Sequence, residues 1–217
     1  MKELTPKSLR FIPAALCLVL ALLANNAKAA PSYWDINGTD AGAGGATPSG
    51  TWESAFWSTD SAGASATANW VEGDFPEFAA GTDATGSYTV TANAPHTIAG
   101  MLMQTSTGTV TINGTGILSI AAGVQGFSSS GTLQINSVLG GTGGYEGQSG
   151  TVQLYGINTF SGGSLLNGNL TYFNNNSSFG SGVIAPITTG GTSGSPKYAA
   201  LLSTGGFVWL PITHYAP

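Results

Sequence analysis

The second half of the chain alternates apolar and polar residues in short runs. The clearest examples are the pairs Tyr88 and Val90, Val110 and Ile112, and the later group Ile117, Leu118 and Ile120. Alternation with a period of two predicts strands that bury one face and expose the other. Asn113-Gly114 lies between two of these strands and is a strong turn signal. The turn either closes a hairpin or forms the corner of a solenoid, and the pattern alone leaves both open.

Three segments of this half share a pattern in which a small polar residue, glycine and threonine precede two spaced apolar positions. They are Thr107–Ile112, Ser130–Ile135 and Ser149–Leu154, and their starts lie 23 and 19 residues apart. This spacing is close to one turn of a β-helix, in which each strand pairs with its equivalent one turn away, ~4.8 Å along the axis. A chance match in a chain rich in glycine and threonine is the alternative, but the shared order of apolar positions favours a repeat. The predicted fold class is all-β, a parallel β-helix or β-solenoid.

A run of small polar residues follows the third repeat and contains no group suited to acid–base chemistry. It consists of Asn158, Thr159, Phe160, Ser161, Gly162 and Gly163, and the similar segments 167–171 and 179–182 come after it. The run resembles the autotransporter-associated β-strand repeat of bacterial surface proteins, and the resemblance covers roughly residues 140–190. It implies an exported structural or adhesive β-solenoid, passenger-like, with no catalysis and no cofactor. Its partners would be extracellular glycans or other cell-surface ligands.

Aromatic residues are concentrated before the repeats. Four of the five tryptophans and eight of the ten acidic residues lie within residues 31–86. The segments 33–38, 50–52 and 69–70 look like the region that often precedes autotransporter-associated repeats. An aromatic segment suits a cap, because the first turn of a solenoid would otherwise expose its core and its unpaired strand edge. The predicted organisation is an irregular, aromatic-rich N-terminal cap at 30–86, solenoid repeats at 87–190 and an irregular tail at 191–217.

The first 29 residues have the pattern of a Sec-type signal peptide. Three cations precede an apolar run of 14 residues at 11–24, which is short for a membrane span. Ala27-Lys28-Ala29 then provides a small-x-small cleavage motif, so cleavage is predicted between Ala29 and Ala30. An uncleaved N-terminal anchor is the alternative. The predicted localisation is secreted or cell surface, with no membrane insertion of the mature chain.

Removing this segment makes the chain strongly acidic. The remaining residues keep Lys197 against nine carboxylates, which gives a formal charge of −8. One cation cannot neutralise a series of phosphates, so we expect no binding to nucleic acid or to anionic lipid. The single cysteine, Cys17, leaves with the signal segment, so no disulfide or thiolate chemistry is expected.

Low charge and high glycine content exclude two other classes of protein. Charged residues make up 7% of the chain, and 33 residues are glycine. Exposed helix faces are normally rich in Glu, Lys and Arg, so a helical protein is disfavoured. Disordered chains usually combine low hydrophobicity with high charge, which this sequence lacks.

Two acidic segments are candidate metal sites. Residues 35–40 place oxygen ligands at alternate positions around a turn, as calcium loops do, but lack the closing bidentate glutamate. An Asx turn is the favoured interpretation. Glu72, Asp74 and Glu77 favour a surface loop over a metal site. The two histidines, His96 and His214, lie outside any nucleophile or zinc motif, so no catalytic or metal residue is predicted.

The tryptophans of the cap region support a second functional hypothesis. Trp52, Trp57 and Trp70 have carboxylates nearby, and exposed indoles beside carboxylates can stack on sugar rings. A carbohydrate-binding module is therefore the alternative function. Packing within the cap is the favoured role of these residues, and a glycosidase using the neighbouring carboxylates is disfavoured.

The C-terminal sequence departs from the resemblance. Many members of the family carry longer repeat arrays and a C-terminal β-barrel, and no such segment is recognised here. We therefore expect a truncated product or a short secreted member.

Overall fold

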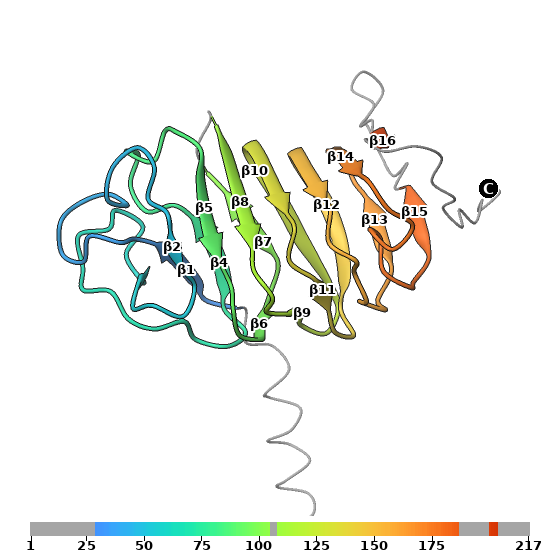
Figure 1. Ribbon diagram of the computed structural model, residues 1–217, viewed down its shortest axis with the longest axis horizontal. Coiled ribbons are helices and arrows are strands. Elements are labelled where there is room, and N and C mark those ends of the chain that lie inside the picture. The colour runs from blue at the N-terminus through green and yellow to red at the C-terminus, as the bar shows by residue number, and fades with distance from the viewer. Residues whose placement is uncertain (1–28, 105–107, 187–199, 204–217) are drawn as a thin grey trace, which may run out of the picture.

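The computed structural model describes residues 29–104, 108–186 and 200–203, and the described part is all-β. Its strands stack side by side along the long axis of the molecule (Figure 1). They form a parallel β-solenoid of about five turns, with an aromatic cluster in the N-terminal region. The predicted fold class is confirmed. No helix in the described residues is long and apolar enough to cross a membrane.

Successive turns of the solenoid, or rungs, place their strands in three tracks that run along the stack. The first track contains β2 (Gly50–Thr51), β5 (Tyr88–Thr91), β8 (Thr109–Asn113), the later half of β10 (Val124–Ile135), the later half of β12 (Gly144–Leu154), β14 (Leu170–Phe173) and β16 (Ala200–Ser203). The second contains β1 (Pro31–Trp34), β4 (Phe75–Phe78), β7 (Met101–Met103), the earlier halves of β10 and β12, β13 (Ser164–Leu166) and β15 (Ile184–Pro186). The third is a separate sheet of β6 (His96–Ile98), β9 (Leu118–Ile120) and β11 (Leu139–Gly140).

The six-residue repeat marks equivalent positions in successive rungs. Thr132 pairs with Thr109 in the rung before it and with Thr151 in the rung after it. The three residues that follow keep the same register in all three strands. The repeat is therefore structural, with spacings that equal the lengths of two rungs. Thr107, the first residue of the first copy, lies outside the described residues.

The turn at Asn113-Gly114 is a solenoid corner. β8 ends at Asn113 and pairs in parallel with β5 and β10, whereas the next strand, β9, belongs to the separate sheet. Gly114 has φ = 112°, and a Cβ there would lie 2.0 Å from the carbonyl oxygen of Ala92 in the preceding rung. Only glycine suits this close approach with a positive φ. The hairpin alternative is wrong.

Apolar side chains fill the interior as columns, one per inward-facing position. One column contains Val90, Ile112, Ile135, Leu154 and Phe173, which occupy equivalent positions in five rungs and are all buried. Burying a side chain of this size contributes roughly 1.5–3 kcal/mol relative to exposure. A single rung cannot bury its apolar face alone, so stacking supplies the core.

The aromatic cluster lies at the N-terminal end of these columns. Its ring centroids lie 4.7–6.3 Å apart, and its members are Trp34, Trp52, Trp57, Trp70 and Phe78. β3 (Trp57–Ser58) pairs antiparallel with β1, whereas the pairings within the three tracks are parallel. This antiparallel strand covers the edge that the first parallel strand would otherwise expose. The arrangement is the aromatic-rich cap that the sequence predicts.

Several sequence predictions concern residues outside this description. The signal segment up to residue 28 and Lys197 are among them, as is His214. Within the predicted C-terminal tail, residues 200–203 form β16 and pair in parallel with β14.

Candidate functional site: a groove across the rungs

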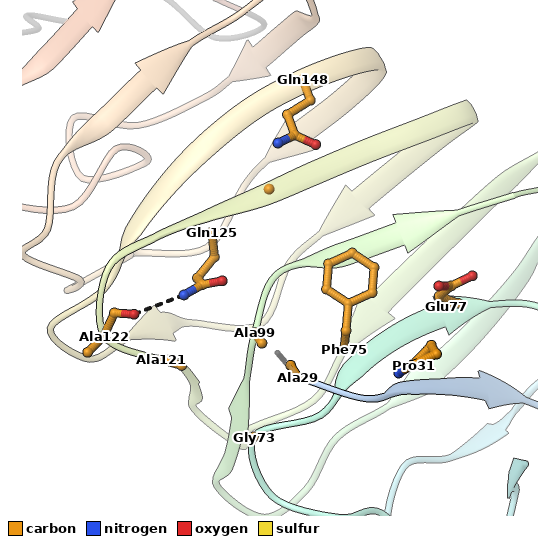
Figure 2. A pocket seen from close by; sticks show the side chains of 11 residues that line it. Ala29, Pro31, Gly73, Phe75, Glu77, Ala99, Ala121, Ala122, Gln125 and Gln148 are labelled. Carbon is orange, nitrogen blue, oxygen red and sulfur yellow. Dashed lines mark hydrogen bonds between the residues drawn. The ribbon is translucent and has the colours of Figure 1, made fainter. Parts of the chain in front are cut away.

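A groove with a volume of about 710 Å³ crosses several rungs on the side where the third track meets the second (Figure 2). Its walls come from β1, β4, β10 and β12, and from the corners that precede β7 and β10. The lining residues are Ala29, Pro31, Gly73, Phe75, Glu77, Ala99, Ala121, Ala122, Gln125, Gly126 and Gln148. Because these residues belong to successive rungs, the groove runs along the solenoid axis.

Small residues at the corners create the hollow. Ala99 and Ala121 follow buried isoleucines of the third track and line the groove at the corners. A Cβ at Gly100 would lie 2.7 Å from the Phe75 ring, and one at Gly126 would lie 2.7 Å from the amide of Gln148. Glycine at these two positions therefore leaves room for the two larger side chains that form the groove.

Phe75 and Glu77 reach the groove because successive side chains of β4 point alternately into the core and outward. Pro76 and Phe78 of this strand are buried, whereas Phe75 and Glu77 are half-buried on the outer face. The ring of Phe75 stands beside Glu77 in Figure 2, with Gln125 on its other side. The Phe75 amide donates to the carbonyl of Ala30 at 2.8 Å, which ties β4 to the start of β1. The groove therefore has an aromatic face next to a carboxylate.

Hydrogen bonds orient the polar side chains of the groove. Gln125 donates from Nε2 to the carbonyl of Ala122 at 2.9 Å. Gln148 donates from Nε2 to Glu146 Oε2 at 3.1 Å and accepts at Oε1 from Ser128 Oγ at 3.4 Å. The carboxylate of Glu77 accepts a hydrogen bond from Nε2 of Gln104. These contacts hold two amides and one carboxylate along the groove.

The electrostatic environment of the groove is acidic. Among the described residues that line it, Glu77 is the only charged one. Every lysine and arginine of the sequence lies outside the described residues, so no described side chain carries a permanent positive charge. The described surface thus presents no cationic partner to an anionic ligand.

A second polar cluster joins the cap to the first rung. His96 lies between two carboxylates, with Nδ1 2.8 Å from Glu72 Oε1 and Nε2 3.3 Å from Glu53 Oε1. Its ring stacks on Trp52 with a centroid distance of 5.7 Å. Burial raises the pKa of Glu53, but backbone amides of Ala94 and Asn93 outweigh it, so this pKa is lowered overall. The cluster connects two segments of the cap, at Glu53 and Glu72, to the first rung at His96.

The two acidic segments that were candidate metal sites, residues 35–40 and 72–77, have structural roles. The Asn37 amide donates to Asp35 Oδ1 at 3.0 Å, which confirms the Asx turn. Burial raises the pKa of Asp35, although the backbone amides of Asn37 and Gly38 oppose the increase. Asp74 accepts from Ser32 Oγ at 2.7 Å, while Glu72 contacts His96. Among the described residues, no group of three or more His, Cys, Asp or Glu is arranged to hold a metal ion.

The tryptophans named for glycan contact lie in the core. The exposed fractions of Trp52, Trp57 and Trp70 are 0%, 3% and 9%. The Trp57 indole donates to the carbonyl of Trp52 at 2.9 Å, and its ring packs against both neighbours. These indoles do not offer an open face to a sugar, and their burial agrees with the packing role.

The N-T-F-S-G-G run continues the third track beyond β11. Asn158 accepts at Oδ1 from the Leu139 amide at 2.8 Å and donates from Nδ2 to the Ser178 carbonyl at 2.7 Å. Its side chain thus joins the rung before it to the rung after it. Phe160 is fully buried, whereas Thr159 and Ser161 face outward and Gly162 and Gly163 turn the next corner. The run is a structural element of the rung.

The predicted cleavage position lies at the edge of the groove. Ala29 lines the groove, and Ala30 is exposed at the start of β1. Cleavage between them stays a prediction.

Three side chains of the groove, those of Phe75, Gln125 and Gln148, were not predicted as site residues. A phenylalanine and two glutamines in alternating strands form no recognisable motif.

The chain has a relative among autotransporter adhesins. It is 37% identical over 169 residues to the Adhesin BmaC autotransporter of Brucella suis biovar 1 (strain 1330). The alignment covers 76% of this chain and 5% of the relative, so the chain spans a small part of that protein's length. No family model matches the sequence, and no solved structure matches it.

Proposed function

We propose that this chain is an exported adhesive segment, a passenger-like part of an autotransporter-type surface protein that performs no catalysis. The observation that carries the proposal is a parallel β-solenoid together with 37% identity to a protein named as an autotransporter adhesin. The named protein is far longer, so its adhesive role is transferred to this chain only as part of the proposal.

The solenoid suits a surface segment for a mechanical reason. Every rung is hydrogen-bonded to its neighbours, and the apolar columns continue from rung to rung. Such a stack behaves as a quasi-one-dimensional rod whose long sides are available for contact. Adhesion would use these sides, because the interior is filled with side chains.

Export supports the same proposal from the sequence. The N-terminal segment has the charge, apolar run and cleavage motif of a signal peptide, and the relative's name places that protein among autotransporters. We propose that the protein is secreted or located at the cell surface. The inter-rung contacts of Asn158 support the finer assignment of the run at 158–163 to the autotransporter-associated repeat.

The carbohydrate-binding module based on exposed tryptophans receives no support from the geometry. The indoles it would use are packed against one another beneath the cap surface. Sugar stacking requires an accessible ring face, so a glycan site would have to lie elsewhere.

An adhesion assay tests the proposed function. Fluorescent beads coated with the exported, purified chain are mixed with a panel of animal, plant and bacterial cells, and attached beads are counted. We expect saturable attachment to at least one cell type, and competition by the soluble chain. Beads coated with the heat-unfolded chain control for non-specific attachment. Equal attachment of folded and unfolded coats, or attachment to none of the cells, would contradict the adhesive role.

A further inference from the structure

We propose that the groove across the rungs binds a neutral oligosaccharide, with Phe75 as the stacking platform and Glu77, Gln125 and Gln148 as partners for hydroxyl groups. The inference rests on the proposed adhesive function and names the site and the class of ligand. It differs from the tryptophan hypothesis in location, because the groove lies outside the aromatic cluster.

The dimensions of the groove fit an extended ligand. Its volume of about 710 Å³ lies within the range of roughly 300–1,000 Å³ that is typical of small-ligand sites. Gln125 and Gln148 come from β10 and β12, which are neighbours in the second track. Gln125 pairs with Tyr145 rather than with Gln148, so the two amides lie at different positions along the groove. A linear chain of sugars presents hydroxyl groups along its length and could meet both amides.

The chemistry of the lining suits a sugar. One face of a pyranose ring carries C–H groups, and these pack against an aromatic ring such as Phe75. Carboxylate oxygens accept hydrogen bonds from hydroxyl groups, and a carboxamide both donates and accepts. Gln125 and Gln148 each use Nε2 in a contact within the protein, and Oε1 of Gln148 also accepts from Ser128 Oγ, so these contacts fix how both amides are oriented. The groove combines the apolar and polar contacts that a sugar ring requires.

Charge limits which glycans fit. Glu77 lines the groove, Glu146 lies next to Gln148, and the described residues include no lysine or arginine. A sialylated, sulfated or uronate-rich glycan would bring negative charge next to these carboxylates without a cation to offset it. Neutral glycans avoid this repulsion, so the proposal commits to them. An extended peptide is the competing occupant, and the experiment below separates the two.

A glycan panel tests the proposal directly. The exported chain is applied to an array of neutral, sialylated and sulfated oligosaccharides, and the affinity for the best ligand is measured by calorimetry. We expect binding to neutral members only. Gln148→Ala should weaken binding about tenfold, because the hydrogen bond between this exposed amide and the ligand is lost. Gln153→Ala is the matched control: it is the same change in β12, on the first track and away from the groove.

Two further variants keep the test informative. Phe75→Ala should abolish measurable binding, and circular dichroism reports whether this half-buried residue is also needed for folding. Gly126→Ala fills the groove without removing a contact residue. Its new Cβ would lie 2.7 Å from the flexible end of Gln148, which must move. We expect Gly126→Ala to weaken binding at least tenfold while the thermal midpoint changes little.

The outcomes separate this inference from the adhesive role. Beads that attach equally well before and after enzymatic removal of glycans, with no array binding, would overturn the inference and leave adhesion standing. Array binding that groove variants do not affect, or that prefers acidic glycans, would also overturn it. The chain could also bind the array while its beads attach to no cell. That result would support the groove as a sugar site and contradict the adhesive role.

Discussion

Asn158 makes hydrogen bonds that a strand backbone would make in a regular rung. Its side chain accepts from the Leu139 amide and donates to the Ser178 carbonyl, and the residue is 3% exposed. Both partners are backbone groups in a shielded position, where an unsatisfied donor or acceptor is costly. Asn158 therefore stabilises the third track beyond β11, where regular strands end among the described residues.

Replacing Asn158 tests this role. Asn158→Ala leaves one amide and one carbonyl unsatisfied, and at about 1–3 kcal/mol each the free energy of unfolding should fall by about 2–6 kcal/mol. Chemical denaturation monitored by circular dichroism measures the change. Asn158→Asp keeps the acceptor for Leu139 and loses the donor to Ser178, so it should still be destabilising. Asn176→Ala, at an exposed position of the next rung, is the control and should change stability by less than about 0.5 kcal/mol. Equal effects of Asn158→Ala and Asn176→Ala would refute the bridging role.

At the scale of elements, charged side chains connect the loops of the cap. Asp83 accepts from the Ala43 amide at 2.7 Å and from the Gly45 amide at 2.6 Å, which joins the loop before β5 to the loop after β1. Burial raises the pKa of Asp83, whereas hydrogen bonds from these backbone amides lower it. The hydrogen bonds have the larger combined effect, so the pKa lies below its usual value. The folded protein therefore binds the Asp83 proton more weakly than the unfolded chain does.

This difference predicts an acid-sensitive cap. The stabilisation from Asp83 is fully present above the ordinary aspartate pKa of about 4 and is lost as pH falls through the lower pKa of the folded state. Near-UV circular dichroism reports the tryptophan cluster, and we expect its thermal midpoint to fall as the pH drops below about 4. Asp83→Asn should lower the midpoint at pH 7 and reduce its dependence on acid. Asp40→Asn, at an exposed position, is the control. A pH profile unchanged by Asp83→Asn would contradict this assignment.

At the scale of the whole molecule, stacking of successive rungs determines the architecture. The described residues form one sheet of 13 strands and one of three, with long-range pairing throughout. The groove exists only because corners and strands of several rungs lie side by side. Local sequence determines which residues form the strands and corners of each rung. The surface available to a ligand forms only when several rungs are stacked.

Spectroscopy of the exported chain checks the architecture. We expect a far-UV circular dichroism spectrum with the single minimum of β-structure, since the described residues form strands, turns and irregular segments. A helical spectrum with two minima would refute the solenoid. The same sample in 6 M guanidinium provides the unfolded reference.

Much of this protein follows from its sequence. The alternation around Val110 and Ile112 and the spacing of the six-residue repeat predicted both the strands and their register, because a side chain period of two and a constant rung length are local properties. The aromatic cap and the Asx turn at Asp35 were predicted for similar reasons. The sequence also determined the acidic character of the chain.

Only the tertiary structure decided what the pattern left open. Asn113-Gly114 is a corner because its flanking strands find partners in other rungs, and no local signal distinguishes this from a hairpin. His96 meets Glu53 and Glu72 across 43 and 24 residues, and Phe75 lines one groove with Gln125 and Gln148, which follow it by 50 and 73 residues. Such contacts depend on the number of residues in each intervening loop and corner, which alternation does not report. The physical reason is that alternation decides which side of a strand faces inward, whereas stacking decides which residues of different rungs become neighbours.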